Sequence, residues 1–427
     1  MGSYLNPGSF SFRGSLRSKI YVDKSELIAK INEVLYTEQK YICVSRPRRF
    51  GKSMAANMLA AYYDRSENTE ELFQNLMISK DSSYRENLNQ YDVIKINMQE
   101  FLSMSGTIEE MLQMLRDYLL LDFKEAYHEV YFRDEKNLIQ VMKDVFSYTK
   151  CPFVILIDEW DCLFREYKQD KEAQKKYLDF LRVWLKDKDY VALAYMTGIL
   201  PIKKYGSHSA LNMFTEYSMT NPREMAEYFG FTEEEVEKLC QRFDRNFEET
   251  HAWYDGYELV KIDGKEKIYY SMYSPKSVVD AMLSGVFDNY WNQTETYEAL
   301  KAYIKLNFDG LKDAVIHILA GERVQINTGT FSNDMTSFQG KDDVLTLLIH
   351  LGYLSYHWPD KTVTIPNKEV SQEYINAIST MDWSEVTASI EDSRMLLEAL
   401  WNMDGKAVAE GIDKAHREIS ILQYNNE

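Results

Sequence analysis

Short apolar segments of strand length alternate with helical patterns through the first 200 residues, and this alternation restricts the fold more than any other feature of the chain. The strand candidates are Lys40–Ser45, Asp92–Met98, Phe153–Ile157 and Val191–Met196. Their aliphatic runs are typical of strands that are buried on both faces. Buried strands that are separated by helices indicate a parallel sheet with helices packed against it. The sequence therefore predicts an α/β fold with a parallel sheet core for residues 1–210.

The second half of the chain is expected to be mostly helical. Residues 211–300 predict a helical lid-type region. Residues 301–385 predict a winged-helix-like domain, because Asp342–Leu351 and Lys368–Ile378 have helical spacing and flank a hairpin. We expect residues 386–427 to form a C-terminal helical tail. The other helices expected here are Pro222–Phe229, Glu233–Phe243, Pro275–Leu283 and Glu298–Ala320, the last with a break at Gly310.

The charge of the chain is unevenly distributed. The whole sequence has 49 Lys and Arg against 67 Asp and Glu, a net charge of −18, whereas the first 53 residues carry +6. Duplex nucleic acid requires a basic face that covers several phosphates, so nucleic acid is not favoured as a partner. A nucleoside triphosphate needs only a local positive pocket, which the first 53 residues supply.

Neither secretion nor membrane insertion is indicated. The longest apolar runs, such as Val154–Ile157, are far shorter than the roughly 20 residues of a membrane helix, and we see no charged-then-apolar leader. The four cysteines, Cys43, Cys151, Cys162 and Cys240, are dispersed and form no C-x-x-C. These features favour a cytoplasmic protein with reduced thiols and no membrane partner.

The loop between the first strand and the next helix carries the strongest chemical signal. Its sequence matches the second half of the P-loop pattern G-x-x-x-x-G-K-[ST], with Arg46 at the position of the first glycine. In this pattern backbone N–H groups and a helix N-terminus hold phosphates, the lysine neutralises charge and the hydroxyl binds Mg²⁺. We therefore predict nucleotide binding here, with Ser53 as a metal ligand. The predicted nucleotide-binding residues are Arg46, Pro47, Arg48, Arg49, Phe50, Gly51, Lys52, Ser53 and Met54.

Two features of this loop affect the prediction. Pro47 removes one N–H donor, so Arg48 or Arg49 is expected to grip phosphate oxygens with its side chain. The alternative interpretation is an exposed basic turn. It is less favoured because the three other Gly-Lys pairs of the chain neither precede Ser or Thr nor lie between a strand and a helix.

A second group of candidate residues follows the later strands. Asp158 ends an apolar strand and is predicted to bind Mg²⁺, and Glu159 is predicted to act as the general base towards water. Thr197 ends the next strand, where a hydroxyl is able to sense the γ-phosphate or the attacking water. The alternatives are a solvated acidic turn and an ordinary strand end. Asp161 and Arg165 have the spacing of a charge pair at a helix start rather than of catalytic groups.

These residues resemble the bacterial AAA-ATPase-like family. The resemblance is carried by Ser45–Ser53 (S-R-P-R-R-F-G-K-S), by Tyr21–Lys24 before it and by Ile157–Asp161 (I-D-E-W-D) after it, and it extends over about residues 10–380. It implies a P-loop ATPase core, ATP as the nucleotide with Mg²⁺, and an arginine at the first-glycine position as a normal feature. Such proteins are often fused to a PD-(D/E)xK-type nuclease, so the resemblance implies a protein partner or a fused effector nuclease. Members of that family commonly continue beyond the equivalent of Ser420–Glu427 into the nuclease, and we infer no nuclease activity for this chain.

Three functions are compatible with these residues. The leading hypothesis is a Mg²⁺-dependent ATPase whose nucleotide state moves the helical and winged-helix-like regions against the α/β core. The alternative is a nucleotide-gated interaction module that binds ATP or ADP with little hydrolysis, because the loop lacks the first glycine and contains Pro47. A third hypothesis, nucleic-acid binding by the winged-helix-like segment, gains little support from charge. The acidic residues that oppose it are Asp342, Asp343, Glu369 and Glu373.

Overall fold

A five-stranded parallel sheet forms the centre of the first 217 residues, and the four predicted strands all belong to it. The strand order is β2-β3-β4-β1-β5, so β4 lies between β1 and β3. β5 was not predicted. The strands are β1 (Tyr41–Ser45), β2 (Asp92–Asn97), β3 (Phe153–Asp158), β4 (Val191–Gly198) and β5 (Thr215–Tyr217). The computed structural model describes residues 2–202, 211–291, 297–306, 308–332, 335–381, 393, 395–397 and 399–424.

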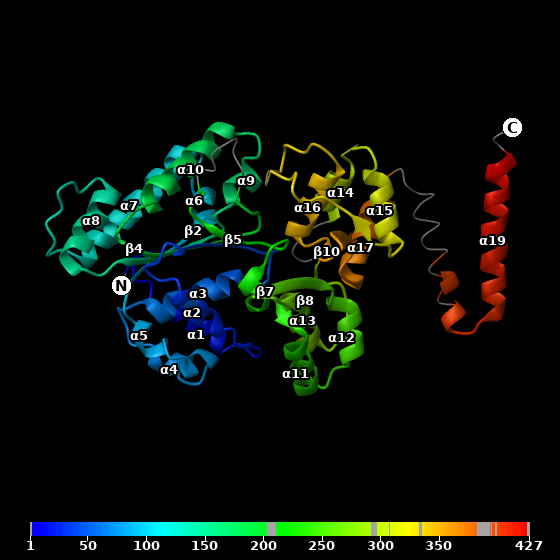
Figure 1. Ribbon diagram of the computed structural model, residues 1–427, viewed down its shortest axis with the longest axis horizontal. Coiled ribbons are helices and arrows are strands. Elements are labelled where there is room, and N and C mark those ends of the chain that lie inside the picture. The colour runs from blue at the N-terminus through cyan, green and yellow to red at the C-terminus, as the bar shows by residue number, and fades with distance from the viewer. Residues whose placement is uncertain are drawn as a thin grey trace.

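Two layers of helices cover the two faces of this sheet (Figure 1). Cys43 and Ile155 point into one hydrophobic cluster, and their neighbours Val44 and Leu156 point into the other, as the pleat of a strand requires. On the first face lie α6 (Met98–Ser103), α7 (Ile108–Ala126), α8 (Leu138–Thr149), α9 (Cys162–Glu166) and α10 (Lys171–Leu185). On the second lie α1 (Phe10–Leu16), α2 (Glu26–Asn32), α3 (Lys52–Tyr63), α4 (Glu70–Phe73), η1 (Met77–Lys80) and α5 (Tyr84–Asn87).

A hairpin that the residue pattern did not predict organises the next region. β7 and β8 pair in antiparallel fashion, and β6 extends them into a three-stranded sheet of order β6-β8-β7. The predicted helix at 233–243 is confirmed, and a capping box of Thr232 and Glu235 begins it. The elements are η2 (Arg223–Tyr228), β6 (Phe231–Thr232), α11 (Glu233–Phe243), α12 (Phe247–Tyr254), β7 (Tyr257–Asp263), β8 (Glu266–Tyr273) and α13 (Pro275–Ser284).

The following region has the predicted order of helix, hairpin and helix. A third short strand, β9, pairs with β11, and the expected helix over 298–320 is divided at Gly310, whose φ of +72° suits glycine. The name winged-helix-like remains a prediction. The elements are α14 (Tyr297–Ile304), α15 (Leu311–Leu319), β9 (Val324–Gln325), α16 (Lys341–Leu351), β10 (Ser355–His357), β11 (Thr362–Thr364) and α17 (Lys368–Ser379).

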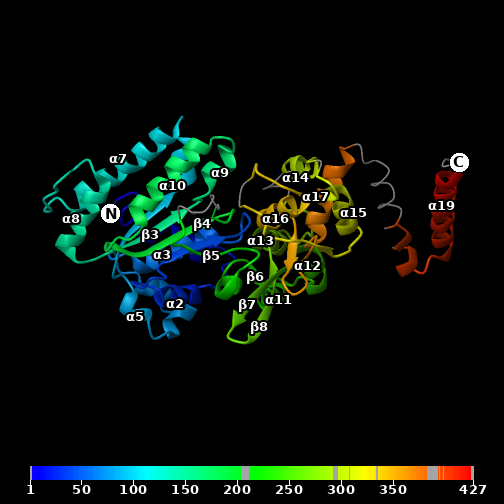
Figure 2. The same ribbon diagram turned by 45° about the horizontal axis from the view of Figure 1, so that its top comes forward.

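Helix α19 (Gly405–Tyr424) lies apart from residues 2–381 in both ribbon views (Figures 1 and 2). It falls in the predicted helical tail, of which residues 386–392, 394, 398 and 425–427 lie outside the described residues. None of the helices in the described part of the chain combines the length and the apolar character that crossing a bilayer requires.

Three of the four acidic residues that were counted against nucleic-acid binding are inside the protein. Asp343, Glu369 and Glu373 are at most 2% exposed, so they contribute little to the surface that a partner meets. These three residues therefore do not count against nucleic-acid binding, because helical spacing alone does not show which faces of α16 and α17 are covered.

Candidate nucleotide-binding site

The predicted site residues gather where three strands end at one edge of the sheet. Val44 of β1 pairs with Thr197 of β4, and Ile157 of β3 pairs with Met196. Parallel strands bring their carboxyl ends to the same edge, which is where open α/β sheets bind ligands. Gly51 stands between β1 and α3 with a φ of +88°, a backbone conformation that L side chains rarely adopt.

Asp158 connects the P-loop to the neighbouring strand. The Ser53 hydroxyl donates to Oδ2 of Asp158 at 2.5 Å, and the Thr197 hydroxyl donates to Oδ1. Asp158 is 4% exposed and Thr197 is fully buried. The arrangement brings a hydroxyl and a carboxylate, both hard oxygen ligands, to the start of α3.

The ammonium group of Lys52 binds two backbone carbonyl oxygens of its own loop. Its ammonium group donates to the carbonyl oxygens of Arg46 at 2.9 Å and Pro47 at 2.7 Å. Burial lowers the pKa of Lys52, while the carboxylates of Glu159 and Asp158 act in the opposite direction. A cation in this position is able to exchange backbone carbonyls for phosphate oxygens.

The side chain of Arg46 binds backbone carbonyl groups inside the protein, although the sequence pattern grouped Arg46 with the nucleotide-binding residues. Its side chain is fully buried. The guanidinium group donates to the carbonyl oxygens of Ser45 and Tyr217 at 2.9 Å and of Met225 at 3.1 Å. Burial lowers the pKa of Arg46 to about 9. This arginine therefore ties β1 to β5 and η2 beneath the loop.

Glu159 forms an ion pair with Arg165, which the sequence pattern paired with Asp161 alone. Arg165 forms an ion pair with Glu159 and a second one, at 3.4 Å, with Asp161. The predicted pair of Asp161 and Arg165 therefore exists, but it also includes the candidate base. Burial raises the pKa of Glu159, and the charges of Arg165 and Lys52 oppose this effect.

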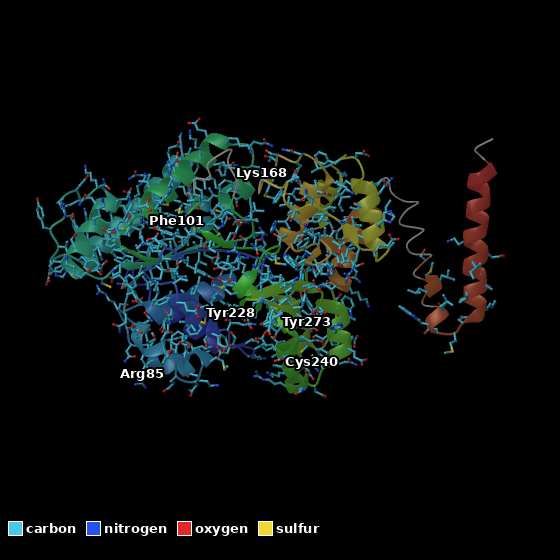
Figure 3. All side chains as sticks on the ribbon, in the orientation of Figure 1. Arg85, Phe101, Lys168, Tyr228, Cys240 and Tyr273 are labelled. Carbon is cyan, nitrogen blue, oxygen red and sulfur yellow. The ribbon has the colours of Figure 1, made fainter. Side chains whose placement is uncertain are left out.

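The loop opens into a cavity of about 1130 Å³. Most of the predicted loop residues and Glu159 line the cavity. Its described lining does not include Arg46, Pro47, Asp158 or Thr197. Tyr228, which lines it, lies at the border between the sheet domain and the region that contains Tyr273 and Cys240 (Figure 3). The predicted residues in the lining are Arg48, Arg49, Phe50, Gly51, Lys52, Ser53, Met54 and Glu159.

Several lining residues were not predicted as site residues. The N-terminal segment contributes Ile20, Tyr21 and Val22, and α13 contributes Lys276 and Val279. Apolar side chains of these two segments thus line the cavity together with the cations Lys19, Lys24 and Lys276, and the loop supplies further cations. The family phrase at Tyr21–Lys24 was the available signal for the N-terminal segment, but its residue pattern does not indicate a role.

The loop also contacts the C-terminal half of the chain directly. The Phe50 ring packs edge-on against Tyr257 at a centroid distance of 5.2 Å, and the Phe50 carbonyl accepts the N–H of Gly230 at 3.1 Å. Tyr257 in turn donates to the carbonyl of Gly352 at 2.8 Å. A side chain at Gly352 would lie 2.9 Å from Cβ of Pro47. The P-loop is therefore packed between β7 and the end of α16.

The fold and this edge of the sheet define a P-loop NTPase domain. The AAA-ATPase-like family model, described as predicted AAA-ATPase, matches residues 12–207. An uncharacterized protein in the vnfD 5′ region of Azotobacter chroococcum mcd 1 is 24% identical over 289 residues, which are 65% of this chain and 51% of that protein. The chain thus spans about half the length of this relative.

Solved structures that resemble the chain include two nucleotide complexes. The Aeropyrum pernix ORC2 protein, in ADPNP and ADP complexes, has a TM-score of 0.31 at 9% identity and matches 88% of this chain and 97% of its own. AMPPCP-bound DnaA from Aquifex aeolicus has a TM-score of 0.27 at 11% identity, over 95% and 94% of the two chains. Likenesses of this size do not bear on the function of this chain.

Proposed function

We propose that this chain binds ATP with Mg²⁺ at the loop between β1 and α3 and hydrolyses it to ADP and phosphate. The observation that carries the proposal is the 2.5 Å hydrogen bond from Ser53 to Asp158, beside Lys52 and at the mouth of a large cavity. A phosphate chain requires such a combination of lysine, helix N-terminus and metal-binding oxygens. The family model that matches residues 12–207, described as predicted AAA-ATPase, supports ATP as the nucleotide.

The donor set at Ser53 and Asp158 fits Mg²⁺. The cation takes hard oxygen ligands and usually keeps several waters and phosphate oxygens. In the described part of the chain no group of three or more His, Cys, Asp or Glu side chains is arranged to hold a metal. The protein ligands would therefore be Ser53 and Asp158, and nucleotide and water would complete the shell. Bound there, Mg²⁺ would neutralise charge on the β- and γ-phosphates.

In the proposed reaction a water oxygen attacks the γ-phosphorus and its proton passes to the Glu159 carboxylate. The bond between the γ-phosphorus and the bridging oxygen breaks, and its electron pair leaves with ADP. Lys52, Arg48 and Arg49 bind phosphate oxygens. Because Thr197 is buried and donates to Asp158, we assign it the orientation of this carboxylate rather than a contact with phosphate.

Nucleotide binding is proposed to move the C-terminal regions. The support is the set of contacts that join the loop to β7 and α16 through Phe50, Tyr257 and Gly352. Phosphate that draws Lys52 away from the carbonyls of Arg46 and Pro47 would shift this loop, and the packed neighbours would follow. Close-packed interiors transmit such displacements.

Phosphate release by wild type, Lys52→Ala and Glu159→Gln tests the proposal. We expect Lys52→Ala to lose ATP binding and Glu159→Gln to bind ATP while turnover falls about 100-fold or more. The ion pair of Lys124 and Glu135 lies at the surface, so Lys124→Ala and Glu135→Gln are matched controls that should retain the wild-type rate. Equal rates in all five proteins would refute ATP hydrolysis at this site.

A nucleotide-gated interaction module with little hydrolysis is the second candidate. The observation that favours it is that the protein itself engages both Lys52 and Glu159. Nucleotide that co-purifies without turnover would support this candidate. Steady multiple turnover would exclude it.

A further inference from the structure

A short connection between α9 and α10 lies between the nucleotide cavity and the C-terminal half of the chain. This α9–α10 connection consists of residues 167–171 and directly follows Arg165 and Glu166 of α9, which line the cavity. Figure 3 shows Lys168 of the connection at the side of the sheet domain that faces α14 and α16. A displacement of α9 at the cavity would therefore carry the connection with it.

Two lysines of the α9–α10 connection contact the C-terminal region. The ammonium group of Lys168 lies over the ring of Tyr303 in α14, 5.8 Å from the ring centre. The ammonium group of Lys171 donates to the Oγ1 atom of Thr336 at 3.0 Å. Tyr303 is 8% exposed, and its ring packs edge-on against Phe338. The lysines therefore reach a packed part of the C-terminal region.

The backbone of the connection is fixed to α10. The side-chain amide of Gln174, which is 1% exposed, donates to the carbonyl oxygens of Tyr167 at 2.9 Å and Lys168 at 3.2 Å. Asp170 caps α10, because its carboxylate accepts the N–H of Ala173 at 2.9 Å. Both lysines thus extend from an ordered backbone, which reduces the entropy that their contacts cost.

The C-terminal region is attached to the sheet domain in two different ways. The attachment at the P-loop is apolar, and its aromatic residues Phe50 and Tyr257 are fully buried. The attachment at the connection is polar, with Lys168 and Thr336 half-buried and Lys171 exposed. Exposed cation–π contacts and hydrogen bonds stabilise less than buried ones, because water competes for the same groups. A rotation of the C-terminal region would therefore break the lysine contacts before the packing at Phe50.

We propose that the α9–α10 connection is a latch, which holds the C-terminal region against the sheet domain and opens when nucleotide binding moves that region. This inference rests on the proposed function, because the latch resists the movement proposed there. A ligand shifts a conformational equilibrium only by its difference in affinity for the two states. A latch that favours the closed state therefore lowers the apparent affinity for nucleotide, and its removal should raise it. A contact that only stabilises the fold would not have this effect.

The test measures how tightly latch variants bind the non-hydrolysable ATP analogue AMPPNP with Mg²⁺, by isothermal titration calorimetry. We expect Lys168→Ala/Lys171→Ala to bind the analogue about threefold or more tightly than wild type. Lys168→Arg/Lys171→Arg keeps both cations and should bind as wild type does. Unchanged or weaker binding by the double alanine variant would overturn the inference.

A covalent latch tests the opposite direction. In Lys171→Cys/Thr336→Cys a short bis-maleimide joins the two positions, and we expect AMPPNP binding to weaken about threefold or more after cross-linking. Wild type treated with the same reagent is the control for the native thiols, of which Cys43, Cys162 and Cys240 are buried. Cross-linked protein that binds like the untreated variant would also overturn the latch.

The remaining controls separate the latch from folding and from the nucleotide site. Lys124→Ala/Lys136→Ala removes two exposed lysines elsewhere on the sheet domain and should leave AMPPNP binding unchanged. If Lys168→Ala/Lys171→Ala does not fold, Thr336→Val decides, because it removes one acceptor and should tighten binding by a smaller factor. Wild type that does not bind AMPPNP would refute the proposed function, and the latch with it. Wild-type binding with no change in any latch variant would refute the latch alone.

Discussion

The hydroxyl of Ser53 lies 2.5 Å from the Oδ2 atom of Asp158, although 105 residues separate them in the chain. Both atoms are oxygen ligands of the kind that Mg²⁺ prefers. The contact exists because α3 begins where β1 ends, and because β3 delivers its last residue to the same edge of the sheet. It is the geometric basis of the proposed ATP site.

The metal dependence of nucleotide binding should follow this contact. ATP with Mg²⁺ is expected to raise the melting temperature of the wild-type protein in proportion to the logarithm of its concentration. EDTA should remove most of that gain. In Ser53→Ala, which lacks one ligand, EDTA should change the ATP-induced shift little. Ser103→Ala on the exposed side of α6 should behave as wild type, and a full Mg²⁺ effect in Ser53→Ala would contradict the assignment.

Substitution of Arg46 is expected to lower mainly the stability, whereas substitution of Arg48 is expected to weaken mainly ATP binding. Arg46→Ala leaves the carbonyls of Tyr217 and Met225 buried without this donor, so we expect a loss of about 3 kcal/mol in the free energy of unfolding. Arg48 is exposed, and Arg48→Ala should change stability by less than about 0.5 kcal/mol while it weakens ATP binding. Urea denaturation measures the first effect and thermal-shift titration the second. Similar stability losses in both variants would show that Arg46 is not the structural residue.

The free energy of unfolding should fall as the pH rises from about 4 to about 7. Burial raises the pKa of Glu369 to about 7, compared with about 4.3 in an unfolded chain. The folded protein therefore retains a proton that the unfolded chain releases, so the contribution is complete below about pH 4 and disappears as the pH passes 7. The shift corresponds to about 4 kcal/mol at most.

Glu369→Gln isolates this contribution. The amide oxygen still accepts the N–H groups that Tyr290 and Trp291 donate to Glu369, but it cannot ionise. We expect the variant to be more stable than wild type at pH 8 and to lose the decline between pH 5 and pH 7, measured by chemical denaturation. The exposed Glu38→Gln should retain the wild-type slope. An unchanged slope in Glu369→Gln would assign the pH dependence to other groups.

Communication between the P-loop and α16 is testable at Gly352. A Cβ atom there would lie 2.7 Å from the Trp291 ring and 2.9 Å from Pro47. Gly352→Ala is therefore expected to weaken ATP binding as well as lower the melting temperature. Gly321→Ala is the matched control, because its φ of +84° resembles the +89° of Gly352 but nothing lies within 4 Å of the added atom. It should carry the backbone strain alone and bind ATP normally. Equal ATP affinities in the two variants would show that packing at the end of α16 does not affect nucleotide binding by the loop.

The sequence pattern predicted four of the five strands of the sheet domain but did not predict the hairpin that follows it. β1, β3 and β4 are mostly apolar, β2 alternates apolar with polar residues, and helices separate all four, which leaves few alternatives to a parallel sheet. β7 and β8 mix charged and aromatic residues, and the exposed tip at 264–266 weakens the alternation further. The Asp263-Gly264 pair was the available hairpin signal.

The sequence alone determined the identity of the loop, the candidate ligands Ser53 and Asp158 and the candidate base, because strand ends and helix starts impose local patterns on the residues beside them. Only the tertiary structure decided that Arg46 is buried, that Arg165 holds Glu159 and that the N-terminal segment and α13 complete the cavity. These relationships depend on burial and on contacts between distant segments. Local residue patterns contain no information on which side chains packing brings together.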